Sequence, residues 1–369
     1  MTLSLEPASG PMGQIPVIDI SGSLPQSEIA NRLVDAANTY GFVYLKSLGK
    51  DIPVEVIDDI FALSKSFFES PTEEKEPCRI QTNNRGWVAM HAETLDTTNQ
   101  RIGDFKEAFN LAEFSNGKAQ QPLPPAFEPH EERLDRFQNY CHDLMGKILV
   151  LFAIGLKVDP SKGGSDWFAS RHRGSEPSSC TLRFLHYPPI PSNADYKPEI
   201  DIRAGAHSDY GSITLLFQRP GQPGLEIIPP STASHLLRDY RNAASWTPVP
   251  VFPPGTENDA SPPILVNIGD LLSHWTNGLF KSTVHRVVFP GDGKEGGEDR
   301  YSIAYFGHPM GPTILEPVPS EMVQELGGAD SGAGMGVEAM TADEHLMSRL
   351  KATYEKLYDE EKDTEATKS

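Results

Sequence analysis

The sequence predicts a mostly β protein whose strands form a sandwich, barrel or jelly roll, with helices before and after that core. Two observations support this fold class. From about Ser178 onward, short runs rich in β-branched and aromatic residues alternate with turns that contain Gly and Pro. No helix-length run separates these strands, which disfavours a parallel α/β sheet. Apolar residues at helical spacing occur mainly before this region and near the C-terminus.

The N-terminal part is predicted to contain a strand, a helix and a second strand, followed by two longer helices. Ile15 to Ile20 forms the first strand, and residues 42–45 form the second after a helix that Gly41 ends. The next helix is expected from about Pro53 to Phe68. The longest helix carries an apolar stripe made of Leu134, Phe137, Cys141, Leu144, Met145, Ile148 and Phe152.

Six short strands and a final helix complete the expected elements. The strands are Leu182 to Tyr187, Ile213 to Phe217, Leu225 to Ile228, Ile264 to Ile268, Thr283 to Phe289 and Tyr301 to Phe306. Thr341 and Glu344 make a capping box, and Leu346, Leu350, Tyr354 and Leu357 then continue one helical face. The Pro-rich residues 122–129 and the Gly-rich residues 327–336 are predicted loops.

These elements divide the chain into five parts. We expect a loose leader, an N-terminal extension, a long helix with its connection, a β core, and a C-terminal loop, helix and polar tail. Their boundaries are 1–13, 14–130, 131–177, 178–315 and 316–369.

The amino-acid composition limits the classes of function that this protein can have. The chain has 51 acidic and 32 basic residues and a formal charge of -19, so phosphate backbones would repel it and nucleic acid is an unfavoured partner. No run reaches the roughly eighteen apolar residues that a membrane span needs, and the leader lacks the regions of a secretory signal. We therefore expect a cytosolic protein. The three cysteines, Cys78, Cys141 and Cys180, are scattered and odd in number, which suits neither a disulfide framework nor a Cys-x-x-Cys zinc site. We therefore expect them to be small buried hydrophobes.

A candidate metal site is formed by His207, Asp209 and His285. In an extended segment His207 and Asp209, two residues apart, project to the same side. His285 lies in a predicted strand 76 residues after Asp209, which is enough chain for a β-sandwich to bring the segments face to face. A single His is more often a core or surface residue than a ligand. Two imidazoles and one carboxylate on one octahedral face, however, are the arrangement that non-haem iron(II) oxygenases use.

A second pair, Arg300 and Ser302, also lies two residues apart on a predicted strand. A guanidinium makes two parallel charge-assisted bonds to a carboxylate, and a hydroxyl can add a third. Such a pair is often no more than two polar neighbours. Because it follows His285 by one hairpin, we expect it next to the metal.

These residues resemble a known family, the iron(II) and 2-oxoglutarate-dependent dioxygenases of the isopenicillin N synthase-like type. The N-terminal part matches in residues 15–19, 40–44 and 104–109. The C-terminal part matches more closely and in the family's order, in His186-Tyr187-Pro188-Pro189, Ala206 to Leu216, Gly224-Leu225-Glu226, Asn267-Ile268-Gly269-Asp270, Trp275-Thr276-Asn277-Gly278, Ser282 to Val287, Arg300-Tyr301-Ser302, and Phe306 with Pro309.

The resemblance implies a distorted jelly-roll (double-stranded β-helix) core flanked by N-terminal and C-terminal helices. It implies Fe(II) held by the two His and the Asp, and O2 and 2-oxoglutarate as cosubstrates. Arg300 and Ser302 would hold the distal carboxylate of 2-oxoglutarate, and Tyr187 would add a hydroxyl. The product would be an oxidised, by default hydroxylated, small molecule together with succinate and CO2. One departure is Leu185, where plant members often have Asn, so that contact is missing or replaced by Arg183.

Several alternatives stay open at this point. An oxidase of the isopenicillin N synthase type would use the Arg and Ser for its substrate instead of 2-oxoglutarate, and a zinc hydrolase could use the same ligands. A silent jelly-roll binding protein is the non-enzymatic alternative. The final helix either closes the pocket mouth or simply packs against the core. Four residues are candidate pocket walls for which core packing is an equal explanation, namely Phe217, Leu225, Trp275 and Phe306. The substrate and the oligomeric state are not predicted.

Overall fold

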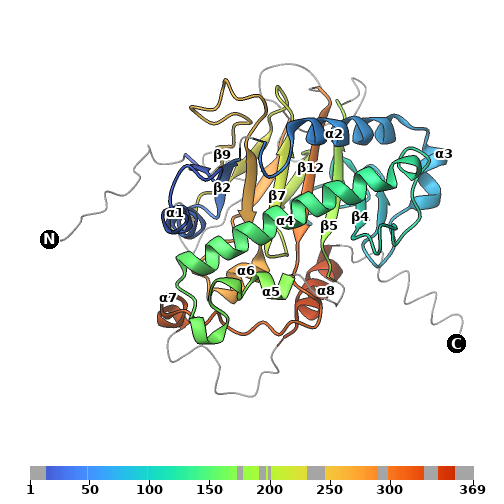
Figure 1. Cartoon of the computed structure of the whole chain (residues 1–369). Coiled ribbons are helices and arrows are strands. Elements are labelled where there is room, and N and C mark those ends of the chain that lie inside the picture. Colours follow the sequence, from blue (N-terminus) through green and yellow to red (C-terminus); the bar gives the residue numbers. More distant parts are fainter. Residues whose placement is uncertain are drawn as a thin grey trace, which may run out of the picture.

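Two β-sheets build the core of the protein, as seen in a computed structural model that describes residues 14–47, 49–97, 99–172, 178–190, 197, 201–230, 246–289, 298–327 and 340–353 (Figure 1). The large sheet contains, in spatial order, β1 (Val17–Asp19), β2 (Phe42–Lys46), β10 (Ile264–Ile268), β7 (Ile213–Gln218), β12 (Arg300–Gly307), β5 (Thr181–Tyr187), β4 (Glu107–Ala112) and β3 (Gly86–Val88). The small sheet contains β6 (Ala204–His207), β11 (His285–Val287), β8 (Leu225–Ile227) and β9 (Thr247–Pro248).

The described helices lie before, between and after these strands. They are α1 (Gln26–Thr39), α2 (Val54–Glu69), α3 (Thr72–Lys75), α4 (Glu131–Gly155), α5 (Ala169–His172), α6 (Asp270–Trp275), α7 (Glu321–Gln324) and α8 (Ala342–Thr353). Short 3-10 turns occupy Glu76–Cys78, Glu128–His130, Pro160–Lys162, Gly164–Asp166 and Glu325–Gly327. Within the described ranges, no helix combines the length and the apolar character that crossing a membrane requires.

Strand alternation separates two cores on the two faces of the large sheet. In β12, Ile303 and Tyr305 pack among residues of α1, α2 and α4, whereas Ala304 and Phe306 face the small sheet. Figure 1 shows α4 crossing in front of the large sheet. The apolar stripe predicted for this helix is the side that packs against the strands. The face that the helices leave open, between the two sheets, is where a site can form.

The predicted fold class is confirmed, with a jelly-roll core made of both sheets. The six strands expected after Ser178 are all present, although β11 is shorter than the predicted Thr283 to Phe289. Sequence patterns missed the strands β3, β4, β6 and β9 and the short helices α3, α5, α6 and α7. Except for β4, these elements are too short to show a period. Tyr354, Leu357 and most of the predicted loop 327–336 lie outside the described residues.

The C-terminal capping box forms as predicted. The Thr341 backbone N–H donates to Glu344 Oε2 at 2.8 Å, and the Glu344 N–H donates to Thr341 Oγ1 at 3.3 Å. The three cysteines are also buried and free, as expected.

The four candidate pocket-wall residues fall into two groups. Phe217 packs under α4 at 5.3 Å from the Phe137 ring, and Trp275 packs edge-on against Trp167, so both belong to the outer core.

Candidate metal centre and its pocket

The small sheet brings the three candidate ligands together. His207 ends β6 and His285 begins β11, and these two residues are directly paired in the antiparallel register. Asp209 follows His207 by two residues, so its carboxylate reaches the same point. Asp209 Oδ1 lies 3.8 Å from His207 Nε2 and 3.7 Å from His285 Nε2. One ligand atom from each residue lies within 4.8 Å of the others, a spacing that a single cation can bridge.

Backbone carbonyls orient both imidazoles. His207 Nδ1 lies 2.7 Å from the Gly205 carbonyl oxygen, and His285 Nδ1 lies 3.2 Å from the Thr283 carbonyl oxygen. A carbonyl can only accept, so each Nδ1 carries the proton and donates it. Each Nε2 therefore presents its lone pair toward Asp209, as metal-binding histidines do.

The two oxygens of Asp209 have different partners. Oδ2 accepts hydrogen bonds from Thr214 Oγ1 at 2.6 Å and from Asn267 Nδ2 at 2.7 Å. Oδ1 is the oxygen that faces the two imidazoles. The carboxylate is thus fixed with one oxygen directed at the candidate ion.

Electrostatics keep His207 and Asp209 in the forms that bind a cation. Burial, together with the neighbouring His285, lowers the pKa of His207 to about 3, so its ring is neutral. Burial opposes ionisation of Asp209, but His285 and His207, with the bonds from Asn267 and Thr214, lower its pKa. Neutral imidazoles and an ionised carboxylate are the forms that ligate metals.

The first lobe of the pocket extends from these residues to Arg300. Arg300 and Ser302 lie on β12 and share the cavity with the candidate ligands, and Tyr187 on β5 is paired with Arg300 across the sheet. Arg300 is 2% exposed and donates from Nη1 to Ser302 Oγ at 3.3 Å. Its guanidinium carbon lies 4.9 Å from the centre of the Tyr187 ring.

Arg300 has no acidic partner among the described residues, and its buried Nε lacks a hydrogen bond. Burial lowers the pKa of this guanidinium, which measures the cost of holding it away from water. A buried unpaired charge is expensive unless a ligand supplies the opposite charge. Arg300, Ser302 and Tyr187 line one cavity, and an unpaired guanidinium in such a cavity can bind a carboxylate.

A second lobe opens on the other side of the candidate ligands. Leu346 and Leu350 of α8 line it and pack with Tyr210, so the final helix contributes part of the pocket wall. Each lobe has a cavity volume of about 70 Å³. Leu225 lines the first lobe and Phe306 lines both, so these two predicted walls do face the pocket.

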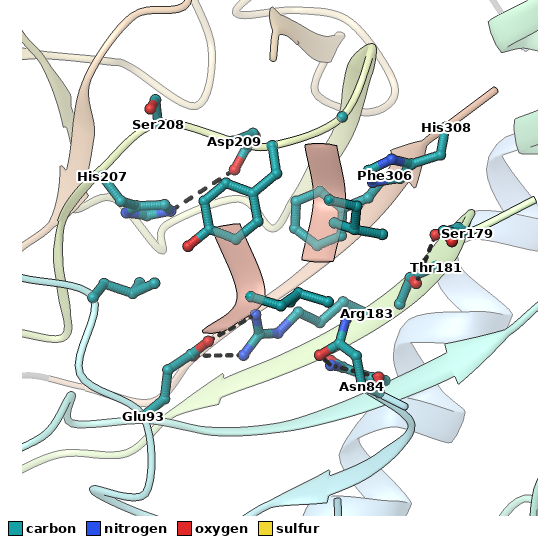
Figure 2. A pocket seen from close by; sticks show the side chains of 16 residues that line it. Asn84, Glu93, Ser179, Thr181, Arg183, His207, Ser208, Asp209, Phe306 and His308 are labelled. Atoms are coloured by element: carbon teal, nitrogen blue, oxygen red, sulfur yellow. Dashed lines mark hydrogen bonds and ion pairs between the residues drawn. The ribbon is translucent and has the colours of Figure 1, made fainter. Parts of the chain in front are cut away.

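Arg183 and Glu93 form the side of this second lobe that lies across from His207 and Asp209 (Figure 2). Arg183 donates from Nη2 to Glu93 Oε2 at 2.6 Å and from Nη1 to Glu93 Oε1 at 3.3 Å. Burial would raise the pKa of Glu93, but Arg183 and Lys106 lower it, so the carboxylate is charged. Leu185, which replaces the expected Asn, lines the lobe of Arg300, while Arg183 borders both lobes.

Two asparagines in the second lobe were missed by sequence reasoning. Asn110 Nδ2 donates to the Asn84 carbonyl oxygen at 3.1 Å and to Asn84 Oδ1 at 2.9 Å. The carbonyl can only accept, which fixes the amide orientation of Asn110 and leaves its buried Oδ1 as an acceptor with no hydrogen-bond partner in the described structure. Neither residue belongs to a recognisable motif. Glu93 and Lys106 were missed as pocket residues too, although Lys106 lies within the matched segment 104–109.

Comparison with known families gives two matches, one in the N-terminal part of the chain and one in the C-terminal part. Residues 15–131 match the family described as the non-haem dioxygenase in morphine synthesis N-terminal domain. Residues 178–309 match the 2OG-Fe(II) oxygenase superfamily and contain all three candidate ligands together with Arg300 and Ser302.

Similar proteins come from several fungi. The UPF0676 protein C1494.01 of Schizosaccharomyces pombe is 37% identical over 92% of this chain and 93% of its own length. The 2-oxoglutarate-dependent dioxygenase htyE of Aspergillus rugulosus is 31% identical over 78% of this chain and 83% of its own. The proline hydroxylase buaE of Petromyces alliaceus is 31% identical over 89% of this chain and 94% of its own.

A full-length protein of Neurospora crassa, solved in complex with alpha-KG and thymine, has a similar structure. The alignment has a TM-score of 0.70 and 27% sequence identity, and it covers 94% of this chain and 99% of that chain.

Proposed function

The chain belongs to the 2OG-Fe(II) oxygenase superfamily, and from that premise we propose that His207, Asp209 and His285 hold the Fe(II) ion. The protein is accordingly a non-haem Fe(II) and 2-oxoglutarate-dependent oxygenase. One observation carries the assignment of the residues. Three oriented ligand atoms converge beside a buried guanidinium that has no acidic partner among the described residues.

Arg300, Ser302 and Tyr187 are proposed to hold the distal carboxylate of 2-oxoglutarate. The guanidinium supplies charge and the two hydroxyl groups supply hydrogen bonds, which is the combination that a carboxylate needs in a buried site. The remaining walls of this lobe are mostly apolar, and they include Leu185, Leu216 and Val287. These side chains exclude water from the reacting groups.

When bound, Fe(II) supplies the chemistry by which O2 and 2-oxoglutarate oxidise a C–H bond, with succinate and CO2 as products. The contribution of the chain is placement. Thr214, Asn267 and the two backbone carbonyls hold the ligands in position, and Arg300 holds the cosubstrate at a fixed distance from them. The second lobe then decides which part of the substrate lies nearest to the metal.

The proposed substrate is a small uncharged molecule that offers an N–H or O–H donor. In the second lobe Arg183 is matched by Glu93, and Glu93 also accepts from Lys106, which in turn contacts Asp104. The guanidinium of Arg183 is therefore already paired with an ionised Glu93, and a charged substrate group would have to compete with this ion pair. Asn110 Oδ1 has no hydrogen-bond partner in the described structure and can accept a hydrogen bond from a donor on the substrate.

The names and complexes of the relatives indicate chemically different ligands, and the pocket favours one kind. The Neurospora crassa protein has been solved with thymine bound, whereas buaE is named a proline hydroxylase. Free proline carries two charges, while thymine is neutral and presents N–H groups. We therefore propose a thymine-like neutral heterocycle as the substrate class. A cytosolic location stays a prediction from the sequence.

An anaerobic titration tests the metal assignment. Adding Fe(II) and 2-oxoglutarate to the protein should produce the weak visible absorption band of the chelate, and His207→Ala should abolish it. His274→Ala removes an exposed histidine and should leave the band intact. An unchanged band in His207→Ala would show that the ion is held elsewhere.

A coupled assay of succinate tests the substrate class. Thymine should stimulate succinate release and free L-proline should not. Asn110→Ala should raise the KM for thymine about 2- to 13-fold, the range set by a single hydrogen bond of roughly 0.5–1.5 kcal/mol. Asn139→Ala, an exposed change on α4, is the matched control and should have no effect. Stimulation by proline alone would overturn the class.

A further inference from the structure

A second cluster of metal-binding side chains lies where α4 meets the large sheet. Glu113 follows β4, His142 lies on α4, and Cys180 immediately precedes β5. One ligand atom from each of them lies within 4.8 Å of the others, as in the candidate iron site. None of the three is part of the iron or cosubstrate site described above.

From this cluster we propose a second cation site, built for a thiolate-accepting ion such as Zn²⁺. The combination of one sulfur, one imidazole and one carboxylate is a donor set that zinc binds and that hard cations such as Mg²⁺ do not favour. The iron site, by contrast, contains no sulfur. The two sites therefore select different ions by the chemistry of their ligands.

Neighbouring groups orient the proposed ligands. Ser178 Oγ donates to Glu113 Oε2 at 2.7 Å, which leaves Oε1 facing His142 Nδ1 at 3.9 Å. The His308 backbone N–H donates to Cys180 Sγ at 3.2 Å, and the thiol donates to the His308 carbonyl oxygen at 3.4 Å, so the backbone of His308 holds the sulfur in position. Tyr305 OH lies 3.3 Å from His142 Nδ1, so its oxygen or a water molecule can complete four ligands.

The partial exposure of Glu113 and His142 gives an ion a path to the cluster. The side chains of Glu113 and His142 are 32% and 30% exposed, while Cys180 lies beneath them at 2%. The thiol of Cys180 gives up its proton when an ion binds, because the thiolate is the form that ligates metals.

The position of the site suggests what it does. Tyr305 belongs to β12, the strand that also carries Arg300 and Ser302. An ion held by Glu113, His142 and Cys180 would tie β4, α4 and the start of β5 together beside that strand. We assign it a structural role, in which binding to the folded state raises stability by mass action.

Cobalt provides a selective probe, because Co²⁺ bound to a thiolate gives a near-ultraviolet charge-transfer band. The full-length protein titrated with Co²⁺ should show this band, and added Zn²⁺ should remove it. His207→Ala should keep the band, since the iron site offers no sulfur. Conversely, Cys180→Ser and His142→Ala should lose it or weaken Co²⁺ binding at least tenfold, yet both should retain the Fe(II) and 2-oxoglutarate band.

Substitutions of the other two cysteines serve as matched controls for this test. Cys141→Ser alters the buried thiol next to His142 in the sequence, and Cys78→Ser alters a remote one, and neither should change the cobalt band. If Cys180→Ser does not fold, His142→Ala and Glu113→Gln, which alter partly exposed side chains, provide the same readout. No cobalt band in the unmodified protein, or a band that survives in Cys180→Ser, overturns the proposal.

Discussion

At the scale of single residues, hydrogen bonds decide which atoms of the site can bind an ion. Thr214 and Asn267 occupy Oδ2 of Asp209, and two backbone carbonyls occupy Nδ1 of the histidines. Each ligand is left with one atom directed at the same point. The spacing His-x-Asp predicts the first two ligands, but none of these supporting contacts has a signature in the sequence.

Thr214→Val tests this support. The change keeps the shape of the side chain and removes the bond to Asp209 Oδ2, so the carboxylate gains freedom to rotate. We expect Fe(II) affinity to fall about 10- to 100-fold in an anaerobic titration. Thr276→Val is the control, because Thr276 is equally buried but bonds the Leu272 carbonyl outside the pocket. Equal losses in both variants would indicate a general effect of lower stability.

Arg300→Gln tests the cosubstrate lobe. Removing one member of a buried charge pair costs about 2–5 kcal/mol, which corresponds to a factor of roughly 30 to 4,000 in Kd. We expect the Kd for 2-oxoglutarate to rise by that factor, while Fe(II) still binds. Arg219→Gln, in which the altered residue pairs with Asp58 at the surface, should leave the Kd unchanged. A similar Kd in Arg300→Gln would place the carboxylate on other residues.

At the scale of elements, close packing at chain crossings restricts which residues can occupy them. Gly41 ends the first helical unit with φ 67°, and its carbonyl accepts from Ile268 N–H at 2.9 Å. A Cβ at this position would overlap the Lys281 carbonyl oxygen. The sequence predicted Gly41 as a helix stop, but the approach of Lys281 depends on a segment 240 residues away in the chain.

A pair of glycine substitutions separates these two effects. Gly41→Ala should destabilise the protein by more than about 1 kcal/mol, because both the backbone conformation and the space oppose a methyl group. Gly146→Ala, inside α4 with nothing near its Cβ, should stabilise it by about 0.5–1 kcal/mol. Denaturant unfolding measures both changes. An unchanged free energy of unfolding in Gly41→Ala would mean that the connection between α1 and β2 can shift away from Lys281.

At the scale of the whole molecule, burial of neutral histidines links stability to pH. His172 lies 2% exposed between the Phe168 carbonyl and Ser212, at 2.8 Å from each. Burial lowers its pKa to about 4, whereas an unfolded histidine has a pKa of about 6.5. Below pH 6.5 the unfolded chain therefore binds the extra proton, and the folded state loses stability as the pH falls toward 4.

The slope of the unfolding free energy against pH can be measured. Between pH 6.5 and 4 this residue should contribute up to about 1.4 kcal/mol per pH unit to the loss of unfolding free energy. His172→Gln should make the unfolding free energy less dependent on pH in that window. His274→Gln, at an exposed position, is the control and should preserve the original slope. An unaltered slope in His172→Gln would exclude this histidine as a source of acid sensitivity.

The sequence by itself predicted the fold class, most strands and the candidate residues of the iron and cosubstrate sites. It could do so because strand alternation fixes which side chains share a face, and because His207, Asp209, Arg300 and Ser302 are close in the chain to their partners. His285 was a candidate because it lies in a later predicted strand, and the structure pairs it directly with His207.

Only the tertiary structure decided the rest of the pocket. Asn84 and Asn110, Glu93 and Arg183, and Leu346 of α8 meet around one cavity although they come from distant segments. The second cluster of Glu113, His142 and Cys180 is likewise assembled from three separate elements. Contacts of this kind depend on how sheets and helices pack, and local propensity and periodicity carry no information about that packing.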